Sequence, residues 1–129
     1  MNDEQYEAQK ARVQPLFDTW IPLLRLQAWR FRYFWERGDG PDGTANARCV
    51  MECAADWRYL HASITVYLGT VADDDDALVE EHVVHELMHV HLHELRLDDD
   101  VHNAHEERVC TQLARAFLDV RDHLTAPKE

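Results

Sequence analysis

The chain has 129 residues, with 13 lysines and arginines against 25 aspartates and glutamates, which gives a formal net charge of −12 at pH 7. This acidity excludes a protein that grips DNA or RNA through phosphate contacts, because such binding needs lysine and arginine to displace counterions. No apolar run approaches the ~20 residues that span a bilayer, and the first residues are polar, so we expect neither a transmembrane helix nor a signal peptide. The length predicts a single domain over residues 1–129.

The cysteines indicate the cellular compartment. Cys49, Cys53 and Cys110 form an odd and low count. Without a secretory signal, this count predicts reduced thiols and a cytoplasmic protein. Cys49 and Cys53 have the C-x₃-C spacing of half a metal site, but no second cysteine pair completes it. We therefore expect both to act as small buried residues.

The first half of the chain predicts a helix followed by strands. Apolar residues recur at spacings of three and four between residues 4 and 26, which predicts one kinked helix or two short helices, because Pro15 and Pro22 interrupt the pattern. Residues 27–35 alternate aromatic side chains with arginine, which is typical of a half-buried strand. GDGPDG at 38–43 predicts a hairpin or a loop between strands. Residues 48–56 fit a helix or a strand, and residues 60–68 predict a strand.

The second half predicts two helices joined by an acidic loop. The run Asp73 to Asp76 suits the start of a helix over residues 77–95, because a carboxylate caps free N–H groups and favours the positive end of the helix dipole. A polar loop is expected at 97–103 and a last helix at 104–124. The core stripe of the first helix is expected to comprise Val79, Val83, Leu87 and Val90. The buried face of the last helix is expected to comprise Val109, Leu113, Ala116, Phe117 and Val120.

An H-E-x-x-H pentapeptide, from His85 to His89, lies within the first of these helices. Residues four apart on a helix differ by about 40° around the axis and 6 Å along it, so both imidazoles lie on one face and can hold one metal ion. Glu86 is offset by one residue and can reach a metal-bound water as general base. The alternative is a solvated, histidine-rich helix face, since seven of the nine histidines fall within residues 82–105.

The third zinc ligand must come from elsewhere in the chain. Leu95 stands where a metzincin would place its third histidine, which excludes that pattern. Glu106 and Glu107 lie 17 and 18 residues beyond His89, far enough for a second helix to return beside the first. We prefer Glu107, because Cys110 and Ala114 follow it at helical spacing and let the two helices approach closely. Glu106 is expected to face solvent or to pair with a neighbouring base.

The segments HVVHELMHVHLHEL and HEERVCTQLARAF resemble the gluzincin-type zincin metallopeptidases, in particular the minimal single-domain minigluzincins and the phage-encoded metallopeptidases. The resemblance implies an α+β zincin-like fold with an N-terminal helix, a small twisted sheet, the HExxH helix and a glutamate helix. It implies one Zn²⁺ held by His85, His89 and Glu107, with Glu86 as base. It also implies that the strand before the active helix lies at the sheet edge, where a peptide substrate would dock along Ala62 to Tyr67.

These observations predict a small intracellular zinc metallopeptidase acting on peptides or proteins. The chain departs from larger gluzincins at Thr111, where they carry an Asp or Asn that orients a zinc-bound histidine, so the partners of the two imidazoles stay open. The residue that stabilises the oxyanion also stays open among four histidines, namely His82, His93, His102 and His105.

Two other functions compete with this one. The first is a zinc-stabilised binding module of zincin fold with little or no proteolysis. A chain of this length has no room for a second lobe that would enclose a substrate cleft. The second is a nucleic-acid-associated zincin of the SprT-like group, which ranks last because the chain has no basic patch or cysteine-rich ribbon. The sequence gives no oligomeric state.

Overall fold

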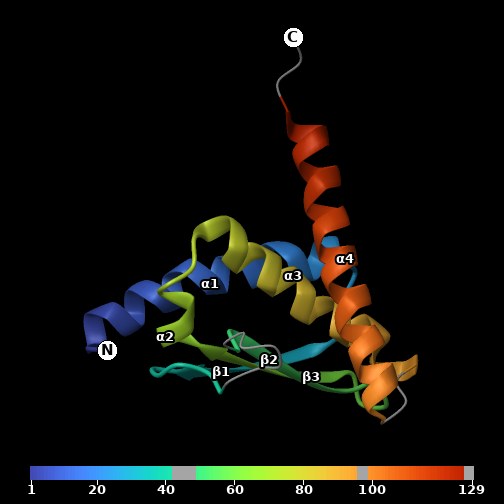
Figure 1. Ribbon diagram of the computed structural model, residues 1–129, viewed down its shortest axis with the longest axis horizontal. Helices are drawn as coiled ribbons and strands as arrows, with labels where there is room; N and C mark the ends of the chain where they lie inside the picture. Colours follow the sequence, from blue (N-terminus) through green and yellow to red (C-terminus); the bar gives the residue numbers. More distant parts are fainter. Residues whose placement is uncertain (42–48, 96–98, 127–129) are drawn as a thin grey trace.

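The computed structural model describes residues 1–41, 49–95 and 99–126 and shows an α+β architecture with helices on one side of a small mixed sheet (Figure 1). In chain order its elements are α1 (Asp3–Leu23), β1 (Arg30–Glu36), β2 (Met51–Asp56), β3 (His61–Tyr67), α2 (Leu68–Val71), α3 (Asp76–Leu92), a 3₁₀ turn η2 (His93–Leu95) and α4 (Asp100–Thr125). The ambiguous segment 48–56 thus contains a strand, and the strand predicted at 60–68 is confirmed.

The N-terminal segment is one helix despite its two prolines. Asn2 caps α1 through a hydrogen bond that its side chain accepts from the N–H of Gln5, and the Gln5 side chain accepts one from the N–H of Asn2 in return. Pro15 and Pro22 both lie inside the helix. The side chains that α1 buries are Val13, Phe17 and Trp20. Packing of this face therefore outweighs the loss of two backbone donors.

The sheet has the order β1-β3-β2, with β1 parallel to β3 and β2 antiparallel to it. The expectation that the segment from Ala62 to Tyr67 lies at the sheet edge is therefore wrong, because β3 is the central strand and bonds on both sides. Ala62, Ile64 and Val66 are 2%, 0% and 0% exposed. The most apolar strand therefore occupies the central position of the sheet, where neighbouring strands flank it on both sides. Within the described chain the edges belong to β1 and β2. Of these two, β2 packs against α3.

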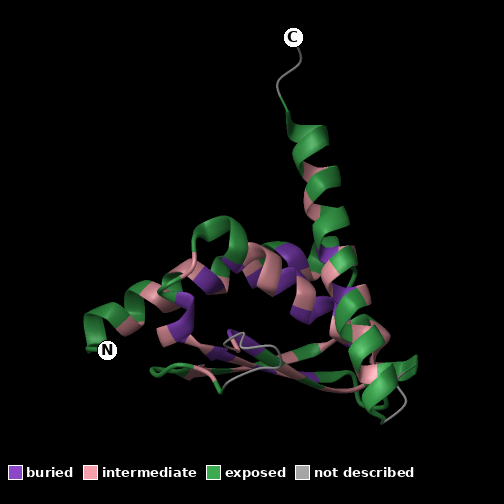
Figure 2. Cartoon of the chain, viewed as in Figure 1, coloured by how far each residue is buried: buried purple, intermediate pink, exposed green. Residues whose placement is uncertain are grey.

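The core lies between the sheet and the helices, and the opposite face of the sheet carries exposed side chains (Figure 2). The predicted stripe of α3 is confirmed, since all four members are 1% exposed or less: Val79, Val83, Leu87 and Val90. Asp75, within the predicted aspartate run, caps α3 by accepting a hydrogen bond from the N–H of Leu78. The cap and stripe fix both the start of α3 and its rotation, and with them the direction of its polar face.

The last helix differs from its prediction. Cys110 and Ala114 are its buried residues, whereas Phe117 and Val120 are 42% and 56% exposed. Figure 1 shows why: α4 is longer than α3 and its C-terminal end extends beyond the other elements. Over that part only one side of α4 contacts α1 and α3, through Leu118 and Arg121, and Phe117 and Val120 lie on the exposed side. The expected buried face was wrong for Ala116, Phe117 and Val120.

The acidic loop is shorter than predicted. Asp99 already caps α4, which begins at Asp100, while residues 97 and 98 lie outside the described residues. GDGPDG joins strands as a loop rather than a hairpin, because β1 and β2 lie on opposite sides of β3, and its residues 42 and 43 also lie outside the described part. None of the described helices combines the length and apolarity needed to cross a bilayer.

Candidate metal centre

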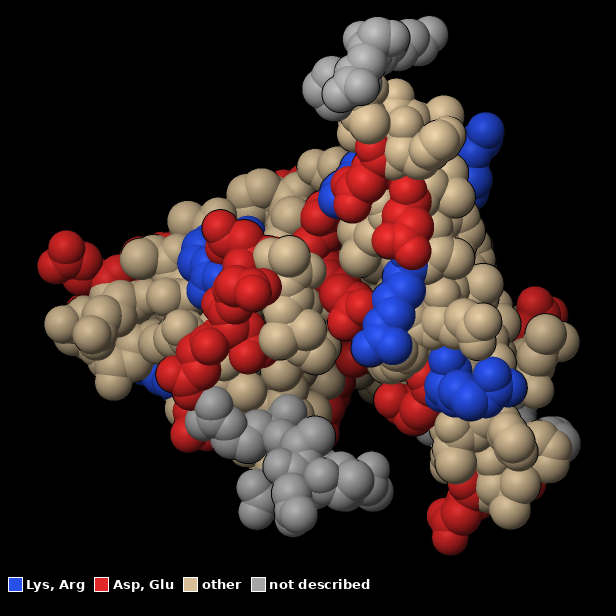
Figure 3. All heavy atoms as spheres, turned by 45° about the horizontal axis from the view of Figure 1, so that its top comes forward, with Lys and Arg blue, Asp and Glu red and all other residues tan. Residues whose placement is uncertain are grey.

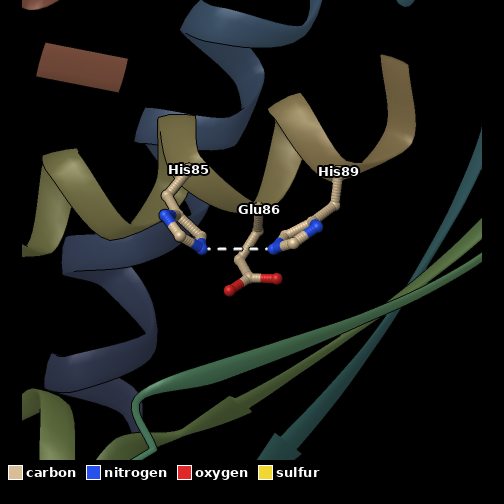
Figure 4. A group of neighbouring side chains, drawn as sticks. All are labelled: His85, Glu86 and His89. Carbon is tan, nitrogen blue, oxygen red and sulfur yellow. Dashed lines mark hydrogen bonds between the residues drawn. The ribbon is translucent and has the colours of Figure 1, made fainter. Parts of the chain in front are cut away.

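Helix α3 brings His85 and His89 together on its polar face. Their Nε2 atoms lie 3.2 Å apart, and both imidazoles point to the same point below the helix (Figure 4). The core stripe lies on another side of α3, as the sequence predicted. The HExxH spacing has therefore placed two nitrogen donors where one ion can contact both.

Helix α4 supplies the third donor. Glu107 places Oε1 2.7 Å from Nε2 of His89 and Oε2 3.2 Å from Nε2 of His85. The two helices approach closely at this point because Cys110 and Ala114, which follow Glu107 at helical spacing, are both fully buried. Glu107 rather than Glu106 thus faces both Nε2 atoms, in agreement with the choice made from the sequence.

Each imidazole is held from its other nitrogen as well. Oγ1 of Thr111 lies 3.0 Å from Nδ1 of His85, and Oε2 of Glu106 lies 2.6 Å from Nδ1 of His89. Glu106 is the more buried of the two adjacent glutamates, with a side chain 10% exposed against 62% for Glu107. Hydrogen bonds of this kind fix the tautomer and rotation of metal-binding histidines.

The donor set fits a zinc ion. Ligands at about 2.0–2.2 Å from tetrahedral zinc lie roughly 3.3 Å from one another. The two Nε2 atoms, and Nε2 of His85 and Oε2 of Glu107, are 3.2 Å apart and match this separation, whereas Nε2 of His89 and Oε1 of Glu107 are closer, at 2.7 Å. The carboxylate of Glu106 can only accept, so Nδ1 of His89 carries a proton, and the short contact of Nε2 with Glu107 is that of a second ring proton, whose place a bound ion would take.

The electrostatics of the three donors agree with binding of positive charge. Hydrogen bonds with His85 and His89 hold the pKa of Glu107 far below its usual range. Burial lowers the pKa of His89, but contacts with Cys110 and Glu107 raise it by more. In both cases the surroundings stabilise a positive charge beside the Glu107 carboxylate.

Glu86 lies beside the three donors without joining them in any hydrogen bond of the described residues. Its side chain leaves α3 between the two imidazoles and points toward the strands (Figure 4). It is 8% exposed, and burial raises its pKa to about 8, with His89 opposing the shift and Glu107 and Glu52 adding to it. One oxygen of Glu86 lies within 4.8 Å of a nitrogen of both histidines.

A pocket of about 480 Å³ adjoins this cluster. It is lined by residues of all three strands together with α3, η2 and α4. Among the four histidines considered for the oxyanion, His93 lines it, whereas His82 lies 3.7 Å from Asp74 and His102 contacts Asp99. The lining residues that the sequence did not point to include Cys49, Glu52 and Cys53, because strand β2, which carries Glu52 and Cys53 and begins two residues after Cys49, could not be told from a helix.

The chain matches no protein-family model, no curated protein and no solved structure.

Proposed function

We propose that the chain is a small zinc-dependent metallopeptidase of gluzincin type and zincin-like fold. One observation carries the proposal: Nε2 of His85, Nε2 of His89 and the carboxylate of Glu107 converge from two helices, and each imidazole is oriented by a further side chain. A solvated histidine-rich helix face needs none of these contacts. The three free thiols agree with a reducing, cytoplasmic location.

His85, His89 and Glu107 would hold the ion beside the pocket, which His89 and Glu107 line. Zinc in such a site supplies an acidified water and polarises the substrate carbonyl. Glu86 would take the proton of the attacking water and return it to the leaving amine. Its position suits both steps, because one of its oxygens lies within 4.8 Å of a nitrogen of each histidine and its side chain lines the pocket. His93 lines the pocket and is assigned to donate a hydrogen bond to the carbonyl oxygen under attack.

The peptide substrate would dock along β2 rather than β3. β2 is an edge strand, it packs against α3, and the five residues Met51 to Ala55 line the pocket beside Glu86. An extended peptide can add to such an edge by main-chain hydrogen bonds, which places its carbonyl groups near the ion.

The test combines metal content with one conservative variant. We expect the purified chain to bind one zinc per molecule and to lose it on His85→Ala or His89→Ala. Glu86→Gln keeps zinc and fold, because Glu86 is not a ligand, but lowers peptide cleavage by about 10²–10⁴-fold. Failure to bind zinc after loading would overturn both the site and the activity.

A zinc-stabilised binding module is the second candidate, and the openness of the site on one side favours it: Glu107 remains 62% exposed. If wild type and Glu86→Gln both bind zinc and neither cleaves a broad peptide mixture, the module replaces the peptidase.

A further inference from the structure

The pocket beside Glu86 is strongly acidic. Four carboxylates line it, those of Glu52, Glu86, Glu106 and Glu107. None of the described lysines and arginines lines it. Glu52, Glu106 and Glu107 alone carry three negative charges, of which a divalent ion offsets two, so the pocket keeps a negative field after metal binding. Figure 3 shows that acidic side chains also prevail over basic ones on the face that it draws. A ligand with a positive side chain is therefore attracted, and one with an acidic side chain is repelled.

Glu52 is the lining carboxylate that takes no part in the zinc cluster. It lies on the edge strand β2, paired in register with Thr65 of β3, and its residue is exposed. Its Oε2 accepts a hydrogen bond of 2.7 Å from the hydroxyl of Tyr67, and its Oε1 has no hydrogen bond among the described residues. One oxygen is thus anchored by Tyr67, while the other has no partner within residues 1–41, 49–95 and 99–126 and faces the pocket that Glu52 lines.

The anchor fixes the charge of Glu52 in place. The hydrogen bond to Glu52 is the main cause that raises the pKa of Tyr67 to about 12, with burial adding to it, so the phenol stays protonated and keeps donating at all physiological pH values. A long, free glutamate would lose side-chain entropy when it binds a ligand, but one held in advance loses less. The contact therefore prepares Glu52 to recognise a cation.

Glu86 gives an independent reason to expect a ligand here. It is 8% exposed, has no hydrogen-bond partner among the described side chains, and points into the same pocket. No buried side-chain oxygen or nitrogen of the described residues lacks a hydrogen-bond partner, so the Glu86 carboxylate is reached by solvent through the pocket that it lines. A ligand in the pocket therefore has direct access to Glu86, and Glu52 lines the same pocket from the strand side.

We propose that Glu52, positioned by Tyr67, selects substrates with an arginine or lysine side chain next to the scissile bond. This inference rests on the proposed peptidase function and adds the substrate class. A peptide added to β2 runs past Glu52, and a guanidinium or ammonium group reaches Oε1 from that strand. Phe34, 42% exposed, lines the same pocket, and the guanidinium of Arg32 lies 5.4 Å from the centroid of its ring, so the apolar surface left for the methylene stem of the ligand is the part of the ring that Arg32 does not cover.

The experiment compares matched fluorogenic peptides that carry arginine, its neutral isostere citrulline, or glutamate beside the cleaved bond. For the zinc-loaded wild type we expect kcat/KM to fall about three- to ten-fold from arginine to citrulline, and further for glutamate. Glu52→Gln removes this preference, and Glu52→Arg reverses it toward the glutamate peptide. Tyr67→Phe keeps the charge but loses the anchor, and reduces the preference in part.

Two controls keep this outcome separate from folding and from the peptidase proposal. Glu7→Gln removes the same charge from exposed α1, outside the pocket, and leaves the preference unchanged. Binding of fluorescein-labelled arginine and citrulline peptides to zinc-loaded Glu86→Gln, with and without Glu52→Gln, tests recognition without turnover. Equal binding of the two peptides, or a preference that survives Glu52→Gln, overturns the inference even if cleavage occurs. Selective binding without wild-type cleavage upholds the recognition and rejects the peptidase.

Discussion

Oε2 of Glu106 lies 2.6 Å from Nδ1 of His89, and this contact decides which nitrogen of the imidazole is available to an ion. Because a carboxylate accepts and does not donate, Nδ1 of His89 carries a proton, and Nε2 is the nitrogen that faces Glu107. Two adjacent glutamates of α4 therefore contact one histidine from opposite sides, Glu106 at Nδ1 and Glu107 at Nε2.

The first prediction is that Glu106→Ala weakens zinc binding by about 10- to 100-fold, the usual cost of losing a partner that orients a ligand. The imidazole of His89 then rotates more freely and loses its tautomer preference. Competition titration against a chromophoric zinc chelator measures the effect. Glu94→Ala, an exposed acidic residue of η2, is the charge-matched control and should leave affinity unchanged. Equal affinities for Glu106→Ala and wild type would contradict the assignment.

The local features of this site were predictable from the sequence. The four-residue spacing of His85 and His89 determines that both lie on one face of any helix, and the valine and leucine stripe determines which face is buried. The choice of Glu107 followed from Cys110 and Ala114, whose small size permits close helix packing. Each of these inferences needs only the geometry of a single helix or of one helix pair.

What the sequence could not predict depends on contacts between distant segments. The edge position expected for Ala62 to Tyr67 was wrong because chain order does not specify which strand takes the centre, and the position of Glu52 in the pocket follows from the strand order. The exposure of Phe117 and Val120 was missed because periodicity does not report where the neighbouring helix ends. The contact of Glu106 with His89 depends on the rotation of α4, which the packing at Cys110 and Ala114 sets.

The second prediction concerns that packing. Ala114→Leu adds three carbon atoms at a fully buried position between α4 and the core, which should destabilise the fold by about 1–3 kcal/mol through overpacking. The displaced α4 also carries Glu107 away from the histidines, so zinc affinity should fall with stability. Ala116→Leu makes the same change at an exposed position of the same helix and should do neither. Urea denaturation measures the stability of the two variants, and the chelator titration measures their zinc affinity. An Ala114→Leu variant as stable and as tightly zinc-binding as wild type would refute close helix contact at this position.

The third prediction is a pH dependence that comes from Glu80. Its Oε2 accepts hydrogen bonds from Nε1 of Trp20 at 2.9 Å and from Nη1 of Arg121 at 2.6 Å, so it ties α1 and α4 to α3. Burial raises the pKa of Glu80, but the hydrogen bonds from Arg121 and Trp20 outweigh burial, and the net shift is downward.

Because the pKa of Glu80 is lower in the folded chain than in the unfolded chain, the unfolded chain takes up the Glu80 proton at a higher pH as the solution is acidified. Stability from Glu80 is then complete above the unfolded value, about 4.3, and is lost as pH falls through the lower folded value. Glu80→Gln retains the shape and an acceptor but not the charge, so we expect it to be about 1 kcal/mol less stable at pH 7. Urea denaturation at several pH values should show this difference shrinking toward zero between about pH 5 and pH 3. A difference that stays constant over that range would show that the Glu80 charge does not stabilise the fold.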